Sequence, residues 1–221
     1  MDQPGYGLIE TIRVRDGRIP FLERHLARLA GSLAELHLPT PSQDVARLVR
    51  PFAGTGDAVL RVEVRDGRAS VTVRDRPPLD PPAVITASEP HHPYPHKTTE
   101  RDCFADAGKE AEVAEADDAL LLTHDGWVAE GTVWTVFWWE GDALHTPALD
   151  LGILPGIGWA RVLELVERVG QGRYRLQALG GKSVLLTNAV RGIVPMASLD
   201  GAVVPADPRT AQLASRFWPS G

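Results

Sequence analysis

The sequence predicts an α+β protein of two domains, because three stretches of the chain differ in pattern. Residues 1–76 combine strand hairpins with helices, residues 77–95 are dense in proline, and residues 96–221 are rich in short apolar strands. Proline restricts the backbone and interrupts regular structure, so the middle stretch is interpreted as an interdomain linker. We therefore expect a small N-terminal α/β domain and a larger domain built on an antiparallel or barrel-like sheet.

The composition is that of an ordinary globular protein. Hydrophobic residues make up 43% of the 221 residues and charged residues 24%, which argues against disorder. The net charge of -6 and the scattered basic residues argue against a nucleic-acid partner. The longest strongly apolar run, 131–139, is about half of the ~20 residues that span a bilayer, and MDQPGYG lacks the features of a signal peptide. We therefore expect a cytoplasmic protein without a membrane partner.

The first domain is expected to alternate hairpins and helices. Residues 7–14 (GLIETIRV) predict a strand, and residues 15–18 the turn after it, because Asp-Gly suits the positive φ of hairpin turns. A second helix is expected over 43–52, and residues 58–75 repeat the hairpin design. The first helix is predicted from leucines spaced 4, 3, 4 and 3, which share one helix face: Leu22, Leu26, Leu29, Leu33 and Leu36.

The proline-rich stretch also contains histidines. Seven of the 20 residues from Arg76 to Pro95 are proline, around a short apolar run, AVIT. His91, His92 and His96 raise a metal hypothesis, but adjacent histidines do not readily point into one site and no carboxylate or cysteine accompanies them at a fixed spacing. We expect no metal. The single cysteine, Cys103, excludes an internal disulfide framework and is assigned no role.

The larger domain is expected to be a run of short strands with a β-branched and aromatic bias. Helices are expected at 99–115, after Gly156 and at about 208–217, and strands at 118–123, 127–139 and 183–196. Four tryptophans in this region are candidates for the sheet core and for a dimer surface: Trp127, Trp134, Trp138 and Trp139.

Three motifs of the larger domain bear on chemistry. Lys97 lies in PHKTTER, Glu130 in GWVAEGT, and a glycine turn in GILPGIGWARV. Together they offer an amine for an aldehyde, a carboxylate for a ring nitrogen and backbone donors for a phosphate, which are the groups that pyridoxal phosphate needs from a protein. Each motif alone is common in surface loops, so the hypothesis depends on their order and spacing.

In this order the motifs resemble the class IV, fold-type IV pyridoxal-phosphate enzymes. This family contains branched-chain and D-amino-acid aminotransferases and 4-amino-4-deoxychorismate lyase. The interval of 33 residues from Lys97 to Glu130 is close to that of the family. The resemblance covers nearly the whole chain, through GYGLIETIRVRDG, HLARL, HKTTER, VAEGTVWTVFW, HTPALDLGILPGI and LLTNAVRGIVPMASLDG.

The resemblance implies a role for each matching residue. Lys97 would be the catalytic residue and form the Schiff base, and Glu130 would pair with the pyridine nitrogen and keep it protonated. Arg28 would hold the phosphate together with the backbone N–H groups of Ile157 and Gly158 at a helix start. The facing phosphate loop would be formed by Asn188 and Ala189.

The sequence departs from the family pattern at several positions. Gly158 and Trp159 stand where the family commonly has a side-chain donor and an arginine, and Thr135 stands in place of an asparagine. The small domain is also short, since an opening hairpin and a longer substrate loop are missing. These departures concern phosphate binding and substrate choice.

Three functions remain open from the sequence. The first is a lyase that converts 4-amino-4-deoxychorismate to 4-aminobenzoate and pyruvate in folate synthesis, with Arg13, Arg65 or Arg191 facing the substrate carboxylates. The second is an aminotransferase for branched-chain or D-amino acids, which uses the same Lys97 and Glu130. The third is a shortened, non-catalytic binding subunit. The resemblance further implies a homodimer acting on a small molecule.

Overall fold

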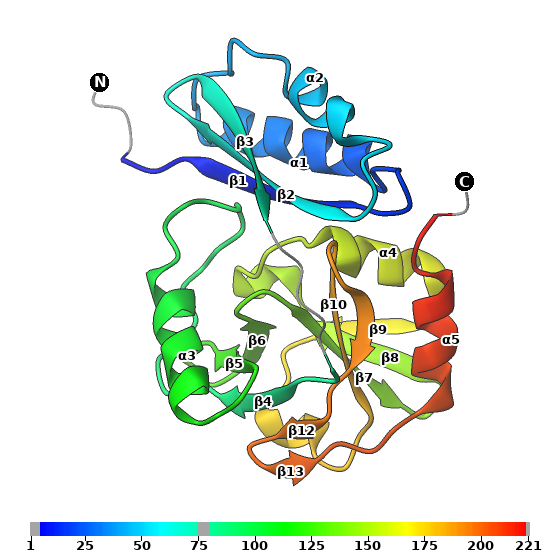
Figure 1. Ribbon diagram of the computed structural model, residues 1–221. Helices are drawn as coiled ribbons and strands as arrows, with labels where there is room; N and C mark the ends of the chain where they lie inside the picture. Colours follow the sequence, from blue (N-terminus) through cyan, green and yellow to red (C-terminus); the bar gives the residue numbers. More distant parts are fainter. Residues whose placement is uncertain (1–4, 75–79, 220–221) are drawn as a thin grey trace. The chain divides into compact units, whose positions relative to one another are not determined.

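The computed structural model describes residues 5–74 and 80–219, and the chain forms two compact units (Figure 1). The first unit contains the described chain up to Arg74, together with His96–Glu100, and the second contains the residues from 80 to Pro95 and Arg101–Trp218. Helices and strands mix in both units, so the predicted α+β class is confirmed. Within the described ranges, no helix combines the length and the apolar character that a membrane crossing needs.

The first unit is a three-stranded antiparallel sheet with a helix packed on it. The strands β1 (Leu8–Val14), β2 (Ala58–Arg65) and β3 (Arg68–Arg74) are arranged in the order β1-β2-β3. Helix α1 (Leu22–Glu35) packs on the sheet. Both predicted hairpin turns are confirmed, because Asp16 and Gly17 have φ of 50° and 72°, and Asp66 and Gly67 repeat these values at 51° and 68°.

The predicted second helix is shorter than 43–52 and has two parts. Helix α2 (Val45–Val49) begins after Asp44, whose side chain accepts hydrogen bonds from the N–H groups of Ala46 and Arg47. A 3₁₀ turn, η1 (Arg50–Phe52), follows it because Pro51 cannot donate to an α-helical hydrogen bond. The local cap and the proline thus set both boundaries.

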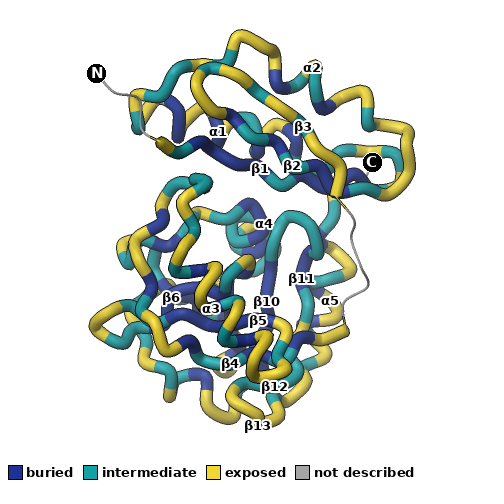
Figure 2. Tube along the Cα trace, turned by 60° about the vertical axis from the view of Figure 1, so that its left-hand side comes forward, coloured by how far each residue is buried: buried dark blue, intermediate teal, exposed yellow. Residues whose placement is uncertain are grey.

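The core of this unit lies between α1 and the sheet (Figure 2). The predicted leucine face is confirmed, with Leu22, Leu29 and Leu33 buried and Leu26 and Leu36 partly buried against the same cluster. The sheet contributes Leu8, Ile12 and Val14, which occupy alternate positions of β1 and therefore share one face. Glu10 falls in the same register and is buried with them.

The segment His96–Glu100 lies beside β1, although the sequence analysis placed it at the start of the larger domain. The N–H of Ile9 donates to the carbonyl of Lys97 over 2.7 Å, and the N–H of Thr99 donates to the carbonyl of Gly7 over 2.8 Å. These bonds form an antiparallel bridge between Leu8 and Thr98. The reason for the difference is long-range backbone pairing, which local composition does not encode.

The second unit contains two five-stranded sheets. One has the order β11-β10-β7-β8-β9 and the other the order β13-β12-β4-β5-β6. The bounds of the first are β7 (Thr135–Glu140), β8 (Ala143–Pro147), β9 (Val169–Gly172), β10 (Val184–Asn188) and β11 (Gly192–Pro195). The bounds of the second are β4 (Ala83–Thr86), β5 (Asp118–Leu122), β6 (Val128–Gly131), β12 (Ser198–Leu199) and β13 (Ala202–Val203).

The two sheets share a buried core, and helices cover their outer faces (Figure 1). Trp138, Val136 and Leu186 of one sheet pack with Val84 and Leu120 of the other. Helix α3 (Asp102–Val113) packs on β5, whereas α4 (Ile157–Leu165) and α5 (Pro208–Arg216) pack on β10 and β11. The 3₁₀ turns η2 (Leu149–Leu151) and η3 (Leu176–Leu179) complete the unit.

Three features of this unit differ from the sequence predictions. The AVIT run inside the predicted linker is strand β4, while residues 77–79 of that linker lie outside the described residues. The sheets are not purely antiparallel, because β4 pairs in parallel with β5 and β12, and β8 with β9. Strand β9 was not predicted, since its VGQG sequence carries no apolar alternation.

Candidate active site

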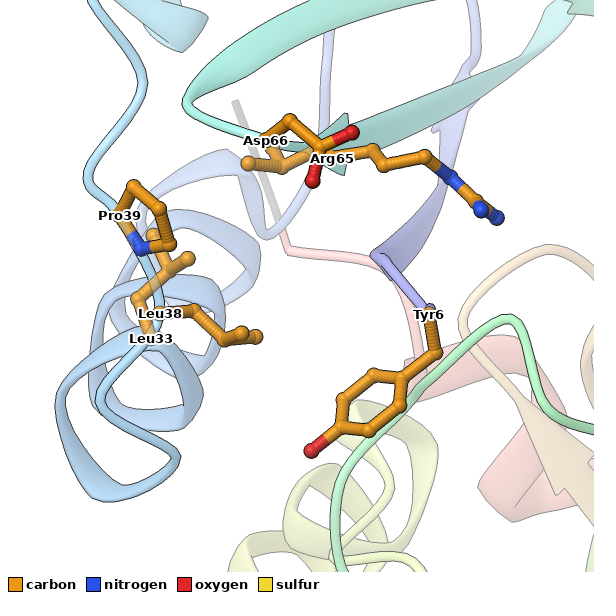
Figure 3. Close-up of a pocket in the computed structure, with 7 residues that line it drawn as sticks. Tyr6, Leu33, Leu38, Pro39, Arg65 and Asp66 are labelled. Atoms are coloured by element: carbon orange, nitrogen blue, oxygen red, sulfur yellow. The ribbon is translucent and has the colours of Figure 1, made fainter. Parts of the chain in front are cut away.

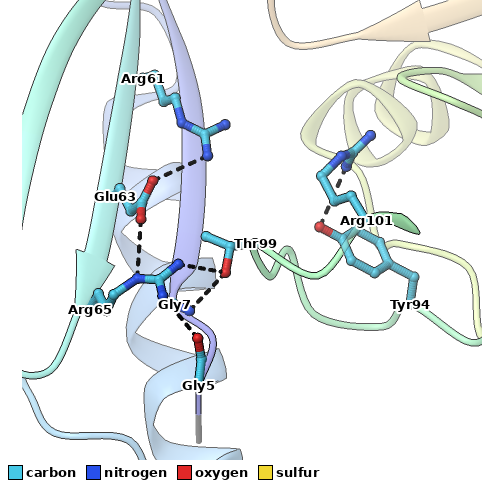
Figure 4. A network of polar contacts seen from close by, with 8 residues as sticks. All are labelled: Gly5, Gly7, Arg61, Glu63, Arg65, Tyr94, Thr99 and Arg101. Atoms are coloured by element: carbon cyan, nitrogen blue, oxygen red, sulfur yellow. Dashed lines mark hydrogen bonds and ion pairs between the residues drawn. The ribbon is translucent and has the colours of Figure 1, made fainter. Parts of the chain in front are cut away.

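Lys97 belongs to the first unit, on the segment that pairs with β1. Side-chain hydrogen bonds also hold the segment that contains Lys97. Thr99 Oγ1 accepts a hydrogen bond from the N–H of Gly7 over 2.9 Å and another from Arg65 Nη2 over 3.1 Å. Arg65 also donates to Glu63 and to the carbonyl of Gly5, so its guanidinium ties β2 and the start of β1 to the lysine segment (Figure 4).

Arg28, the predicted phosphate ligand, is held by a buried glutamate of β1. Arg28 Nε and Nη2 donate to the two carboxylate oxygens of Glu10 over 2.8 and 2.7 Å. His25 lies one turn earlier on α1, and its Nδ1 is 2.7 Å from Glu10 Oε2. Glu10 is 2% exposed and His25 1%. The three side chains therefore form one network that fixes the arginine on the helix surface.

Burial and charge act in opposite directions on this network. Burial alone would raise the pKa of Glu10, but the charge of Arg28 and the hydrogen bonds from His25 and Arg28 outweigh it and lower the pKa to about 2. Burial lowers the pKa of His25, and the positive charges of Arg28 and Lys97 lower it further, against the opposing effect of Glu10. The network thus holds an ionised glutamate beside a neutral histidine.

The first unit has a small pocket that shares Arg65 with the contacts of the lysine segment. It is lined by Tyr6, Leu33, Leu38, Pro39, Val64, Arg65 and Asp66 (Figure 3). Its walls are largely apolar, and the Arg65 side chain extends away from Leu33 and Pro39 in the figure. None of the residues predicted for the cofactor lines it.

Glu130 belongs to the second unit, near the end of β6. It is 6% exposed. Its Oε1 accepts the backbone N–H of Leu154 over 3.1 Å and lies 3.0 Å from His91 Nε2. His91 is itself buried, and its ring packs edge-on against Phe104 with centroids 5.8 Å apart. When His91 carries its proton on Nε2, Glu130 Oε1 has two donors, which fix the position of the carboxylate.

The turn after Glu130 is fixed by a second acid and an arginine. Asp118 Oδ1 accepts the N–H groups of Ala119 and Thr132 and the hydroxyl of Thr132. Burial raises the pKa of Asp118, although these hydrogen bonds oppose that effect. Arg101 Nη2 donates to the carbonyl of Thr132 over 2.5 Å, and Arg101 Nη1 lies 3.4 Å from the hydroxyl of Tyr94 (Figure 4).

Ile157 and Gly158 are the first two residues of α4. The preceding N-cap residue is Gly156, which has no side chain to accept the first N–H groups of the helix, and the first turn holds no acidic residue. A Cβ atom on Gly158 would lie 2.7 Å from Thr187 Oγ1 and 2.9 Å from the Cα of Asn188. The close approach of α4 to the end of β10 therefore requires glycine at this position.

Asn188 is the last residue of β10, and Ala189 begins the turn that follows it. Asn188 Oδ1 accepts the N–H groups of Val190 and Arg191 over 2.9 and 2.8 Å, and its Nδ2 donates to the carbonyl of Val133 over 3.3 Å. The Asn188 side chain thus shapes this turn and links it to the connection between β6 and β7.

The structure brings the predicted residues together in two groups. Arg28 and Lys97 are in the first unit. The second unit holds Glu130, Ile157, Gly158, Asn188 and Ala189. Of the arginines considered for substrate carboxylates, Arg13 is 3% exposed and forms an ion pair with Asp57, and Arg65 is bound as described above. No group of acidic, histidine or cysteine side chains suited to a metal ion occurs within residues 5–74 and 80–219.

The residues that support these groups were not predicted from the sequence. Glu10 carried a usable signal, because an acid at a core-facing position of a strand needs a buried partner. His91 was weighed only as a metal ligand, and nothing in the sequence links it to Glu130, 39 residues away. The sequence indicates only that Thr187 belongs to a strand.

Comparison with known proteins identifies relatives of the chain. Residues 7–199 match the sequence pattern of the family described as amino-transferase class IV. The aminodeoxychorismate lyase of Bacillus subtilis is 38% identical over 88 residues, which cover 38% of this chain and 30% of the lyase. The match therefore spans less than a third of that relative.

Two further relatives match over greater lengths. The D-alanine aminotransferase of Bacillus licheniformis is 25% identical over 235 residues, covering 91% of this chain and 82% of the enzyme. The solved structure of a fold IV transaminase from Curtobacterium pusillum is 28% identical and superposes with a TM-score of 0.83, covering 96% of this chain and 83% of that one.

The lowered pKa values of Glu10 and His25 predict how the free energy of unfolding depends on pH. The folded chain keeps His25 neutral below its ordinary pKa of 6.5, and keeps Glu10 ionised between 4.5 and about 2, so the unfolded chain binds more protons in both ranges. The free energy of unfolding should fall as the pH drops below 6.5, by at most about 1.4 kcal/mol per pH unit for each proton.

Urea unfolding between pH 7 and pH 5 measures this slope. His25→Phe removes the titrating group and should flatten the slope, whatever its effect on absolute stability. Equal slopes for wild type and variant would contradict the assignment of a buried neutral histidine.

Proposed function

We propose that this chain, which belongs to the class IV aminotransferase family, is a lyase that converts 4-amino-4-deoxychorismate to 4-aminobenzoate and pyruvate. The family is one of pyridoxal-phosphate-dependent enzymes. The observation that supports the lyase within this family is the 38% identity to the Bacillus subtilis aminodeoxychorismate lyase. The proposal includes a homodimer acting in the cytoplasm in folate synthesis, and light scattering on the purified protein tests the assembly.

Each unit contains residues with the chemistry that the cofactor needs. Lys97 is an amine for the aldehyde, and each of the other two lysines of the chain, Lys109 and Lys182, is in an exposed ion pair. Glu130 is a buried carboxylate with two donors on Oε1. The first N–H groups of α4 have no side-chain cap, and donors at a helix N-terminus favour a phosphate.

Pyridoxal phosphate, when bound, supplies an electron sink for bond cleavage next to the substrate amine. Lys97 would hold the cofactor through its Nζ, and its free amine would take the proton from the amine-bearing ring carbon of the substrate. The enolpyruvyl group leaves the neighbouring carbon with its bonding electrons and is protonated to pyruvate, while the ring becomes aromatic. Glu130 would face the pyridine nitrogen and favour its protonated form, and His91 and the N–H of Leu154 hold Glu130 in place.

Transamination is the second candidate, and the extent of the match to the D-alanine aminotransferase favours it. It uses the same Lys97 and Glu130 but requires the amino group to stay on the cofactor. The two reactions therefore differ in what a simple amino acid does to the enzyme.

Lys97→Ala tests the role of the lysine. The purified wild type with pyridoxal phosphate should show an absorption band near ~410–420 nm, typical of a lysine-bound cofactor, and Lys97→Ala should lose it. Lys109→Ala, a surface lysine 72% exposed, is the matched control and should retain the band. A wild type without this band at saturating cofactor would contradict both enzymatic proposals and favour a non-catalytic binding subunit.

Product analysis separates the two reactions. With 4-amino-4-deoxychorismate, the lyase should release 4-aminobenzoate and pyruvate in equal amounts. Branched-chain and D-amino acids alone should leave the band near ~410–420 nm unchanged, because a lyase does not retain their amino group. Bleaching by an amino acid, without 4-aminobenzoate formation, would overturn the lyase in favour of the aminotransferase.

A pair of His91 variants tests how Glu130 is held. His91→Gln keeps a side-chain N–H donor, whereas His91→Phe keeps a ring against Phe104 and removes the donor. The loss of one hydrogen bond to a carboxylate costs about 1.5–3 kcal/mol, so His91→Phe should weaken cofactor binding by at least about 10-fold and lower kcat. His91→Gln should restore most of both, and equal defects in the two variants would mean that His91 acts only through packing.

A further inference from the structure

Thr187 places a hydroxyl group near the end of β10. The residue is 1% exposed, and its Oγ1 has no hydrogen-bond partner among the described residues. Buried hydroxyl groups are nearly always paired, because an unpaired one loses its hydration without compensation. A buried hydroxyl without a partner therefore points to a group that binds there.

The hydroxyl of Thr187 lies against the start of α4. Thr187 Oγ1 lies 2.7 Å from the place that a Cβ of Gly158 would occupy, so it fills the space beside the second residue of the helix. Thr135 is the direct neighbour of Thr187 across β7 and β10, and its Oγ1 lies 3.1 Å from the corresponding place at Gly156. Two hydroxyl groups thus face the glycines at the start of α4.

The chemistry of this corner favours an anion. Helix α4 has nine residues, and the partial positive charge of its N-terminus adds to the N–H groups of its first turn. The first turn has no acidic residue, and its N-cap residue is a glycine. The first N–H groups of α4 and the hydroxyl groups of Thr187 and Thr135 can all donate hydrogen bonds, which suits the oxygens of a phosphate.

We propose that Thr187 is a side-chain ligand of the cofactor phosphate, with its hydroxyl donating a hydrogen bond to a phosphate oxygen at the N-terminus of α4. This inference rests on the proposed use of pyridoxal phosphate. It also explains why residue 158 is a glycine, because a side chain there would collide with Thr187 and with the backbone of Asn188. The side-chain donor that position 158 lacks comes from the adjacent strand.

Three variants test the assignment. Thr187→Val removes the hydroxyl and keeps the shape, and Thr187→Ser restores it. Thr146→Val is the matched control, because Thr146 is also fully buried in this sheet but its hydroxyl donates to the carbonyl of Val136 over 2.9 Å. The probes are pyridoxal phosphate, pyridoxal without its phosphate, and inorganic phosphate, and the readouts are cofactor affinity and the melting temperature of the cofactor-free protein.

Thr187→Val should weaken pyridoxal phosphate binding by about 10-fold and leave pyridoxal binding unchanged. The melting temperature of the cofactor-free variant should stay the same or rise, since an unpaired buried hydroxyl is removed. Thr146→Val should lower the melting temperature without changing the preference for the phosphorylated cofactor. Unchanged affinity for pyridoxal phosphate in Thr187→Val, or an equal loss for pyridoxal, would overturn the assignment.

Inorganic phosphate separates this inference from the proposed function. If the wild type forms no Lys97-dependent absorption band, the proposed function fails on that result alone. The assignment of Thr187 is then decided by thermal stabilisation with inorganic phosphate. Stabilisation that is lost in Thr187→Val and kept in Thr187→Ser supports a phosphate site at α4, whereas equal or absent stabilisation overturns it.

Discussion

A buried carboxylate needs fixed hydrogen-bond donors in place of the water that it loses, and each unit of this protein contains one such group. In the first unit, Glu10 receives hydrogen bonds from Arg28 and lies against His25. In the second, the N–H of Leu154 donates to Glu130, which lies against His91. In both units the carboxylate lies against a buried histidine and accepts a hydrogen bond from a second group, the guanidinium of Arg28 or the backbone N–H of Leu154. The donors come from different elements, so holding the charge also fixes the relative positions of those elements within each unit.

Local sequence rules account for much of the fold. The Asp-Gly pairs predict the two hairpin turns, and the leucine spacing predicts the helix that packs on the first sheet. Two of the failures share one cause, because both involve pairing between distant segments. The AVIT run became a strand through its neighbours β5 and β12, and the segment around Lys97 joined β1 through backbone bonds to Gly7 and Ile9. Composition cannot report such partners, since any extended segment offers the same backbone groups.

The predicted site residues were found by resemblance to a family pattern, whereas their supporting residues were not. Lys97 and Glu130 stand in recognisable motifs, but Arg65, His91 and Thr187 support the site through contacts 34 to 39 residues away or through an approach between a helix and a strand. Positions of this kind depend on how elements pack. A glycine such as Gly158 reads in sequence as a lost ligand, and only the structure shows what occupies the space that it leaves.

The backbone pairing of His96–Glu100 with β1 has a consequence for dissecting the protein. β1 is an edge strand of its sheet, and the returning segment satisfies part of that edge. A fragment ending before the proline-rich stretch would leave those N–H and C=O groups free, and an exposed strand edge invites pairing with other chains. The first unit is therefore formed from separate segments of the amino-acid sequence. Permuted or fused versions that carry the five returning residues, rather than simple truncations, are the way to isolate it as a soluble fragment.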